Sequence, residues 1–101
     1  MEIRFEHSPK EVKGMNTTDL RTSFLTENLM KDDQVVLVYT HYDRVIIGGA
    51  KPVHKQVLLV NHGELKADFF LQRREIGIIN TGGSGRVFAD GIVHELGKLD
   101  C

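Results

Sequence analysis

The chain has 101 residues, of which 13 are basic and 14 acidic, so its formal net charge is -1 at pH 7. The chain lacks the basic excess or patch expected of a nucleic-acid or membrane-surface binder, which argues against such partners. A chain of this length forms at most one domain, and such a domain buries roughly two-thirds of its unfolded surface. The charged N-terminus has no apolar run long enough for a signal peptide or a membrane span. With its single cysteine, Cys101, this predicts a cytoplasmic protein in a reducing compartment.

The first quarter of the chain predicts an extended arm followed by one short helix. Residues 1–16 show no sustained period, apart from a short strand expected at residues 2–5. Polar residues 17–19 then offer N-cap oxygens for a helix over residues 18–27. Because two or three turns are not stable alone, we expect this helix to lie on a sheet. Its apolar stripe consists of Leu20, Phe24 and Leu25.

The middle of the chain is dominated by apolar and β-branched residues. Residues 34–47 predict a strand that is buried on both faces and turns near Asp43-Arg44. Glycine and proline at residues 48–52 are expected to end it. Further strands are predicted at residues 53–60 and 69–71, with an Asn-His-Gly turn between them.

The last quarter predicts a β-hairpin. Residues 75–80 are strand-like, Gly82-Gly83-Ser84-Gly85 forms a corner, and Asp90-Gly91 between two apolar runs is a strong two-residue turn signal. Pairing outward from that turn sets four pairs of residues opposite one another: Ala89 and Ile92, Phe88 and Val93, Val87 and His94, and Arg86 and Glu95.

Short strands at regular intervals, glycine corners and a single weak helix favour an antiparallel sandwich or barrel over an α/β unit. A sandwich built this way needs a further strand after the hairpin, yet the sequence stops at Cys101. The unpaired edge that results is an aggregation liability. We therefore expect that these residues are the front portion of a longer polypeptide, or that another subunit covers the edge.

Two long motifs are present, YTHYDRVIIGG at residues 39–49 and FLQRREIGIINTGGSG at residues 70–85. Their order, with Pro52 between them, closely resembles the N-terminal part of the 5-keto-4-deoxyuronate isomerase family. Members of this family are also called 4-deoxy-L-threo-5-hexosulose-uronate ketol-isomerases. The similarity runs from about residue 17 to the end of the chain.

The resemblance implies an all-β fold, a cupin-like or jelly-roll antiparallel β-sandwich with one short N-terminal helix. Residues 1–101 would then be the single N-terminal domain of a two-domain (bicupin) enzyme that assembles as a hexamer. The family isomerises 5-dehydro-4-deoxy-D-glucuronate to 3-deoxy-D-glycero-2,5-hexodiulosonate in pectin degradation. The resemblance also implies zinc, held in the C-terminal cupin domain by a His-x-His, Glu and later His set that no position of this chain matches.

The histidines of the chain do not have the spacing of a metal site. None of the five belongs to a His-x-His or His-Glu-x-x-His pattern. His41 and Asp43 are two residues apart and would share one face of a strand, where they could pair as an oriented base. A hydrogen-bonded structural pair at a strand end is the favoured interpretation.

Arginines offer the second set of candidates. Arg73 and Glu75 would share one face of an extended segment, with Arg74 on the other, and a guanidinium would suit an anionic uronate. A structural ion pair is the favoured interpretation here, and also for Arg44 beside Asp43. The glycine-rich corner lacks the lysine of a P-loop and leads into a strand, so it is interpreted as a turn and not as a phosphate site.

Three hypotheses of function follow. In the first, the chain is a supporting domain of the isomerase, inactive by itself, that shapes the assembly and can lend a residue to the cleft. In the second, it is a stand-alone β-sandwich module that binds an acidic sugar through Arg44, Arg73 or Arg74. In the third, it is an oligomerisation module with a purely architectural role.

Overall fold

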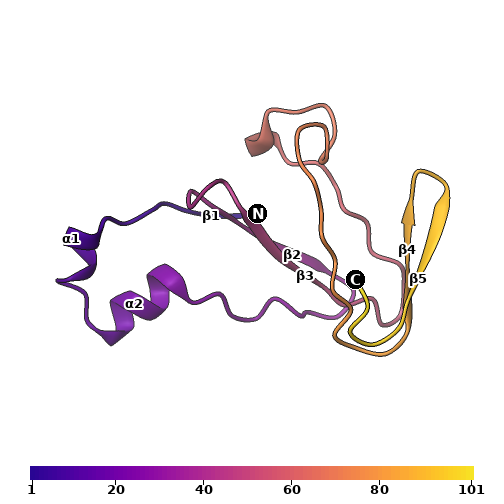
Figure 1. Ribbon diagram of the computed structural model, residues 1–101, viewed down its shortest axis with the longest axis horizontal. Helices are drawn as coiled ribbons and strands as arrows, with labels where there is room; N and C mark the ends of the chain where they lie inside the picture. The colour runs from indigo at the N-terminus through magenta and orange to yellow at the C-terminus, as the bar shows by residue number, and fades with distance from the viewer. The chain divides into compact units, whose positions relative to one another are not determined.

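A three-stranded sheet of order β1-β2-β3 forms the centre of the first of two units in this computed structural model, which describes all of residues 1–101 (Figure 1). The units are Met1–Lys66 and Ala67–Cys101. Strands predominate and the helices are short, which confirms the all-β class in its coarse form. That both units form a single domain stays a prediction. No helix has the length and apolar character needed to cross a bilayer.

Strands β2 (Val35–Thr40) and β3 (Ile46–Ala50) form the antiparallel pair predicted from the middle of the chain. The turn between them contains Asp43 and Arg44, as expected. The second strand ends within residues 48–52, as expected, but only at Ala50, so Gly48 and Gly49 lie inside β3. Gly49 is buried where the Leu29 backbone approaches it, and a glycine inside a strand commonly marks such a close approach.

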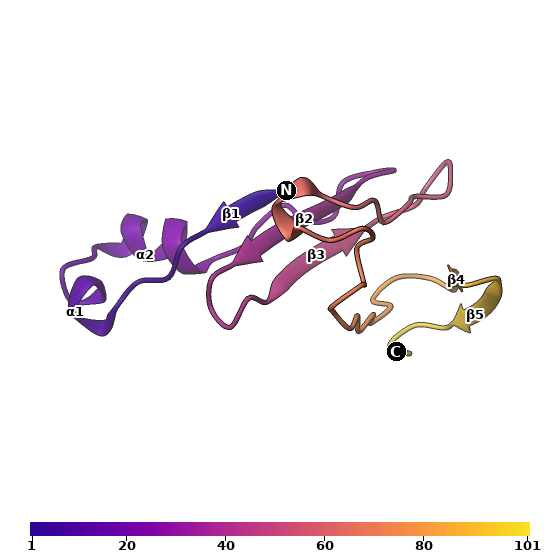
Figure 2. The ribbon, with the colours of Figure 1, turned by 90° about the horizontal axis from the view of Figure 1, so that it is seen from above.

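Strand β1 (Glu2–Arg4) confirms the predicted N-terminal strand, yet it pairs with β2 in parallel, whereas an antiparallel arrangement was expected. Glu2 lies opposite Val38 and Arg4 opposite Thr40. A parallel pair needs a crossover of a dozen residues or more, which the segment between β1 and β2 supplies. Figure 2 shows the three strands side by side.

Two helices lie within that crossover. Helix α2 (Thr17–Phe24) confirms the predicted helix, although its N-cap is Asn16, which forms a capping box with Asp19. It ends sooner than expected because Leu25 is already extended. Helix α1 (Pro9–Val12) lies where an extended arm was predicted. Ser8 and Glu11 close a second capping box there, and proline occupies the first turn.

The strands predicted at residues 53–60 and 69–71 do not form. The backbone N–H groups of Val53, His54 and Lys55 donate to the Asp33 carboxylate and so are not available to a ladder. After them comes the short 3-10 helix η1 (Gly63–Leu65), and local turn bonds such as Gln72 N to Phe69 O take up the later segment. Residues 75–80 are likewise outside any ladder.

In the second unit, strands β4 (Gly85–Ala89) and β5 (Ile92–Leu96) form the predicted hairpin with all four predicted pairs in register. Asp90 and Gly91 both have positive φ, 51° and 76°, as a two-residue turn of this kind requires. The amide of Asn80 closes the open end of the hairpin by donating to Gly83 O, Leu96 O and Gly97 O.

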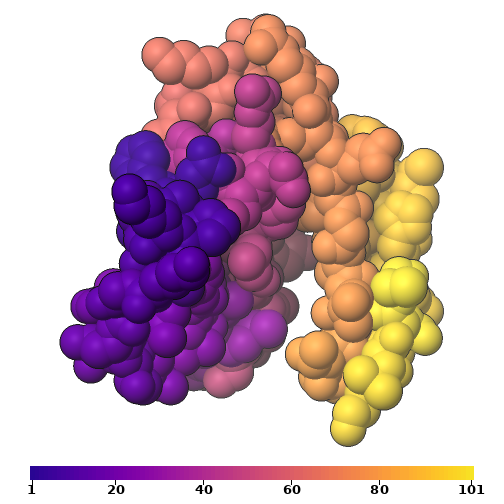
Figure 3. Space-filling model, turned by 60° about the vertical axis from the view of Figure 1, so that its left-hand side comes forward, coloured from indigo at the N-terminus to yellow at the C-terminus, as the bar shows by residue number.

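Very little of either unit is a core. Val38 is the one buried apolar side chain, and Thr40 the one buried polar side chain, so the prediction that residues 34–47 are buried on both faces is wrong. In Figure 3 the indigo N-terminal part of the chain lies directly against the magenta part. Val38 and Thr40 are the residues of β2 that lie opposite Glu2 and Arg4 of β1. Most large apolar side chains of the chain remain exposed.

Candidate functional site

A cavity of about 330 Å³ lies in the first unit, at the end of the sheet where β1 and β2 stop. Strand β1 contributes Arg4, the end of α2 contributes Phe24, and the turn after β2 contributes Tyr42 and Asp43. The rest of its wall is formed by hydroxyl-bearing and apolar side chains: Ser23, Thr26, Thr40, Val45 and Ile47. Polar and apolar groups therefore converge here from three elements that are distant in sequence.

Local hydrogen bonds fix the turn that presents Tyr42 and Asp43. Thr40 donates to Val45 O twice, from its backbone N–H and from Oγ1, each at 2.9 Å. Val45 N in turn donates to Tyr42 O at 3.2 Å. Asp43 and Arg44 have φ values of 51° and 58°, a left-handed conformation that aspartate adopts more readily than most residues. The turn is thus held at both ends by the buried Thr40.

Arg4 is the one cation of the cavity, and its side chain is only 17% exposed. Its Nε donates to Glu2 Oε1 at 3.0 Å. Its Nη1 donates to Leu25 O at 2.6 Å and to Thr26 Oγ1 at 3.5 Å. These bonds orient the guanidinium between β1 and the chain that leaves α2.

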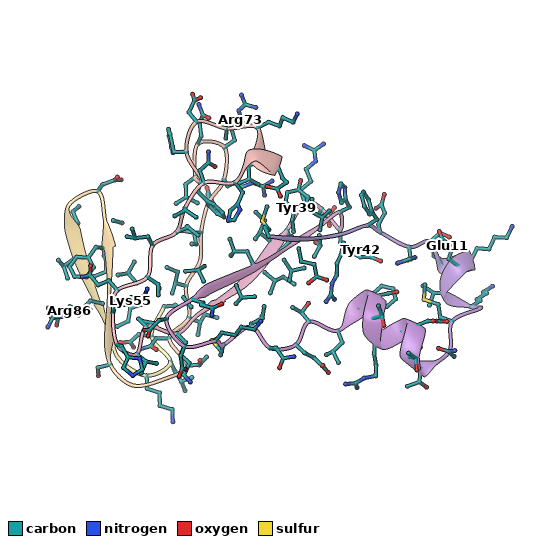
Figure 4. All side chains as sticks on the ribbon, turned by 180° about the vertical axis from the view of Figure 1, so that it is seen from behind. Glu11, Tyr39, Tyr42, Lys55, Arg73 and Arg86 are labelled. Carbon is teal, nitrogen blue, oxygen red and sulfur yellow. The ribbon has the colours of Figure 1, made fainter.

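Tyr42 lies between the sheet and the helices of the first unit (Figure 4). Its hydroxyl oxygen accepts a hydrogen bond from His7 N at 2.9 Å, and its ring centroid is 5.9 Å from that of Phe24. The His7 ring also meets Phe24, at 6.2 Å, while His7 Nδ1 lies 3.1 Å from Glu11 Oε2. The aromatic side of the cavity is therefore fixed by contacts with the N-terminal arm.

The structure separates the predicted pair His41 and Asp43. The positive φ of Asp43 removes it from a strand, so the expectation that the two share a strand face is wrong. His41 stacks on Phe5 at 4.7 Å and meets Tyr39 edge-on at 5.4 Å, whereas Asp43 lines the cavity. Arg44 is exposed in the same turn and is not part of the cavity wall.

The other predicted residues belong to the second unit. Arg73 is exposed and ends a turn, so the strand alternation expected for it does not apply. Arg74 is half-buried and Glu75 is exposed. Whether any of them contacts a substrate stays a prediction. A second hollow lies in this unit beside the hairpin, between Arg86 and Glu95, whose side chains are both exposed and 4.0 Å apart.

The residues of this chain do not fit the zinc implied by the resemblance. Nowhere do three side chains of the kinds that bind metal ions come close enough to share one. His7 is paired with Glu11, His54 with Asp33, and the His41 ring is stacked on Phe5. These three histidines are therefore engaged separately, in contacts that explain them structurally.

Asp33 forms the most highly bonded carboxylate of the first unit. It accepts the backbone N–H groups of His54 and Val53, each at 2.8 Å, and that of Lys55 at 3.3 Å. The His54 ring also contacts it, at 2.8 Å. These bonds, those from the His54 and Val53 backbone foremost, lower the pKa of Asp33 from 3.8 to about 2.

We predict an acid transition at this carboxylate. Since its pKa is lower in the folded chain, its stabilising contribution is complete above pH 3.8 and is lost as the pH falls through about 2. NMR titration of the Asp33 carboxyl carbon should give a midpoint near 2, and the Val53 and His54 amides should exchange faster below it. Asp33→Asn should abolish the transition, whereas Asp32→Asn should leave it. A midpoint near 3.8 would contradict the geometry.

Four residues of this cavity were not predicted from the sequence to belong to a functional site. Tyr42 and Thr40 lie within the motif at residues 39–49, but only their neighbours were weighed. Phe24 was assigned to a core, and its side chain is 48% exposed beside the cavity. Arg4 carries no local signal, since only the parallel pairing of β1 with β2 brings it to Thr40.

These features describe a chain of short strands with one mixed polar and apolar cavity, and no family model matches it. It is 50% identical over 99 residues, 98% of its length, to the 4-deoxy-L-threo-5-hexosulose-uronate ketol-isomerase of Formosa agariphila, of which it covers 35%. It is 50% identical over 99% of its length to that of Lachnoclostridium phytofermentans and covers 36% of it. It is 48% identical over 100% of its length to that of Halalkalibacterium halodurans and covers 37% of it.

The resemblance seen in the two motifs is therefore confirmed along the whole chain. The chain is a homologue of part of the 4-deoxy-L-threo-5-hexosulose-uronate ketol-isomerases. It spans little more than a third of the length of these curated relatives.

Proposed function

We propose that this chain is the N-terminal domain of a cytoplasmic uronate ketol-isomerase that converts 5-dehydro-4-deoxy-D-glucuronate to 3-deoxy-D-glycero-2,5-hexodiulosonate in pectin degradation. The observation that carries the proposal is the identity of about one residue in two over the whole chain to enzymes named for this reaction. The matched length, about a third of each relative, is that of one domain of a larger enzyme. The N-terminal position is proposed from the resemblance of the two motifs at residues 39–49 and 70–85.

The chemical centre of the reaction is assigned to residues outside this chain. Moving a carbonyl between adjacent carbons needs a base for the α-proton and an electrophile that stabilises the enediolate. No cluster of metal-binding side chains exists here, and each histidine with a carboxylate partner makes that contact at the surface. In this proposal the zinc and its ligands belong to a C-terminal cupin domain, and residues 1–101 provide shape and binding groups.

The exposed apolar surface supports a role inside a larger assembly. Phe88, Ile92 and Val93 are about half exposed on a two-stranded hairpin, an element that is marginally stable by itself in water. Leu58 and Ile79 are exposed to 75% and 68%. We propose that a C-terminal cupin domain and neighbouring subunits of a hexamer cover such surfaces, and that the strands of both units belong to one jelly-roll sandwich.

We expect the 101-residue protein to be inactive alone. The test is a uronate isomerisation assay with added zinc, run beside the full-length enzyme of one of the relatives. The expected result is no turnover above background, because the chain has no set of ligands for the metal. Turnover comparable to that of the relative would overturn the assignment of the chemistry to another domain.

A further inference from the structure

The guanidinium of Arg4 is oriented but not saturated. Its Nε and Nη1 donate to Glu2, Leu25 and Thr26, which leaves the two hydrogens of Nη2 without a protein acceptor. The side chain as a whole is only 17% exposed. Because its other bonds fix the planar group, little entropy is lost when an anionic oxygen binds to it.

Two more polar groups of the cavity have unused hydrogen-bonding capacity. The Tyr42 hydroxyl oxygen accepts from His7 N, while its own hydrogen has no protein acceptor. The Asp43 carboxylate lines the same cavity and has no protein partner. The cavity thus offers a cationic donor, a neutral donor and an anionic acceptor. The acceptor would hydrogen-bond to hydroxyl groups and would repel a purely anionic ligand.

The remaining wall is apolar. Phe24 lies beside Tyr42, and Val45 and Ile47 complete the surface. Phe24 is 48% exposed, Val45 51% and Ile47 41%. A wholly apolar ligand would leave Arg4 and Asp43 without partners, at a cost in desolvation. A molecule with one carboxylate, several hydroxyls and a face of C–H groups could bind to the cationic donor, to the anionic acceptor and to the apolar surface of the cavity. The volume of about 330 Å³ is at the small end of ligand cavities, which suits one sugar ring.

We propose that this cavity binds a single uronic acid unit, with its carboxylate on Arg4 Nη2 and the Tyr42 hydroxyl and with its ring hydroxyls on Asp43. The proposal rests on the proposed function, which makes a uronate the substrate. It goes beyond that function by giving the N-terminal domain a sugar-binding site of its own. It also moves the binding role from Arg44, Arg73 and Arg74, the arginines suggested by the sequence, to Arg4.

The test is isothermal titration calorimetry of the 101-residue protein with D-galacturonate, and with D-galactose as the probe that lacks a carboxylate. Galacturonate should bind saturably at one site, and galactose roughly tenfold more weakly, the effect of one charge-assisted hydrogen bond. Arg4→Gln should weaken galacturonate binding by a similar factor. Arg86→Gln, at an exposed arginine of the other unit, should not change it. Equal affinity for both sugars, or no saturable binding, would overturn the proposal.

A second variant separates binding from folding, because Arg4→Gln also removes bonds to Glu2 and Leu25. Asp43→Asn keeps the left-handed turn, since asparagine tolerates positive φ, and should weaken both sugars by a similar factor. Loss of binding in Arg73→Gln or Arg74→Gln but not in Arg4→Gln would contradict the site. Calorimetry measures binding without turnover. A lack of sugar binding would therefore not contradict the proposed isomerase function, and a lack of isomerase activity would not contradict sugar binding.

Discussion

Replacing Gly49 by alanine is expected to destabilise the first unit by about 2 to 3 kcal/mol, the upper range for overpacking a tight contact. A Cβ atom at Gly49 would lie 2.6 Å from Leu29 O and 2.9 Å from Leu29 C. Both are backbone atoms, so no side-chain rotation relieves the clash. Gly49 is also buried in β3, where the strand cannot shift without losing its pairing with Val36.

The matched control is Gly48→Ala in the same strand. A Cβ at Gly48 would lie 2.6 Å from Leu37 Cδ2, the end of a flexible side chain, and 3.1 Å from Val36 O. Leu37 can change rotamer, so this variant should cost clearly less than Gly49→Ala. Urea unfolding followed by circular dichroism measures both. A Gly49→Ala protein as stable as the unchanged protein would show that the Leu29 backbone does not lie this close to Gly49.

Replacing Asn80 by alanine is expected to have the largest effect in the second unit. Its Nδ2 lies 2.9 Å from Gly83 O, 3.0 Å from Leu96 O and 3.1 Å from Gly97 O, and its Oδ1 accepts from Gly82 N at 3.1 Å. At roughly 1 kcal/mol for each bond, with some sharing of the donors, the expected loss is about 2 kcal/mol. The amides of β5 should then exchange faster with solvent.

Asn80→Asp provides the control for this prediction. The carboxylate keeps the acceptor for Gly82 N but has no donor for the three carbonyl groups, which it would repel. Its loss of stability should therefore equal or exceed that of the alanine variant. Hydrogen exchange of β5 measured by NMR reports both. Unchanged exchange in Asn80→Asp would mean that the donor bonds do not close the hairpin.

Local turn chemistry explains which parts of the fold could be predicted. Asp90-Gly91 specifies a two-residue turn, so the hairpin and its register followed from the sequence. A turn was also predicted near Asp43-Arg44, and both residues have positive φ there. The strand at residues 53–60 was predicted from composition and is absent, because Asp33, some twenty residues earlier, takes up the N–H groups of Val53 and His54. Composition does not reveal such a competing acceptor.

The candidate site was predicted only where it coincides with a motif. Asp43 was selected because it lies in the segment at residues 39–49, although its expected partner His41 stacks on Phe5 instead. Arg4 was missed because its position depends on the pairing of Glu2 with Val38, a contact between residues far apart in sequence. No periodicity or spacing within the chain indicates a parallel pair of this kind.

Zinc binding by the 101-residue protein is the most direct test of the view that this chain provides shape and sugar contacts while the metal chemistry belongs to another domain. Native mass spectrometry after incubation with an equimolar zinc salt should show the metal-free mass and only weak, exchangeable adducts, because no three potential ligands converge in the chain. One tightly bound zinc ion per chain, lost when His41 or His54 is replaced by alanine, would contradict it.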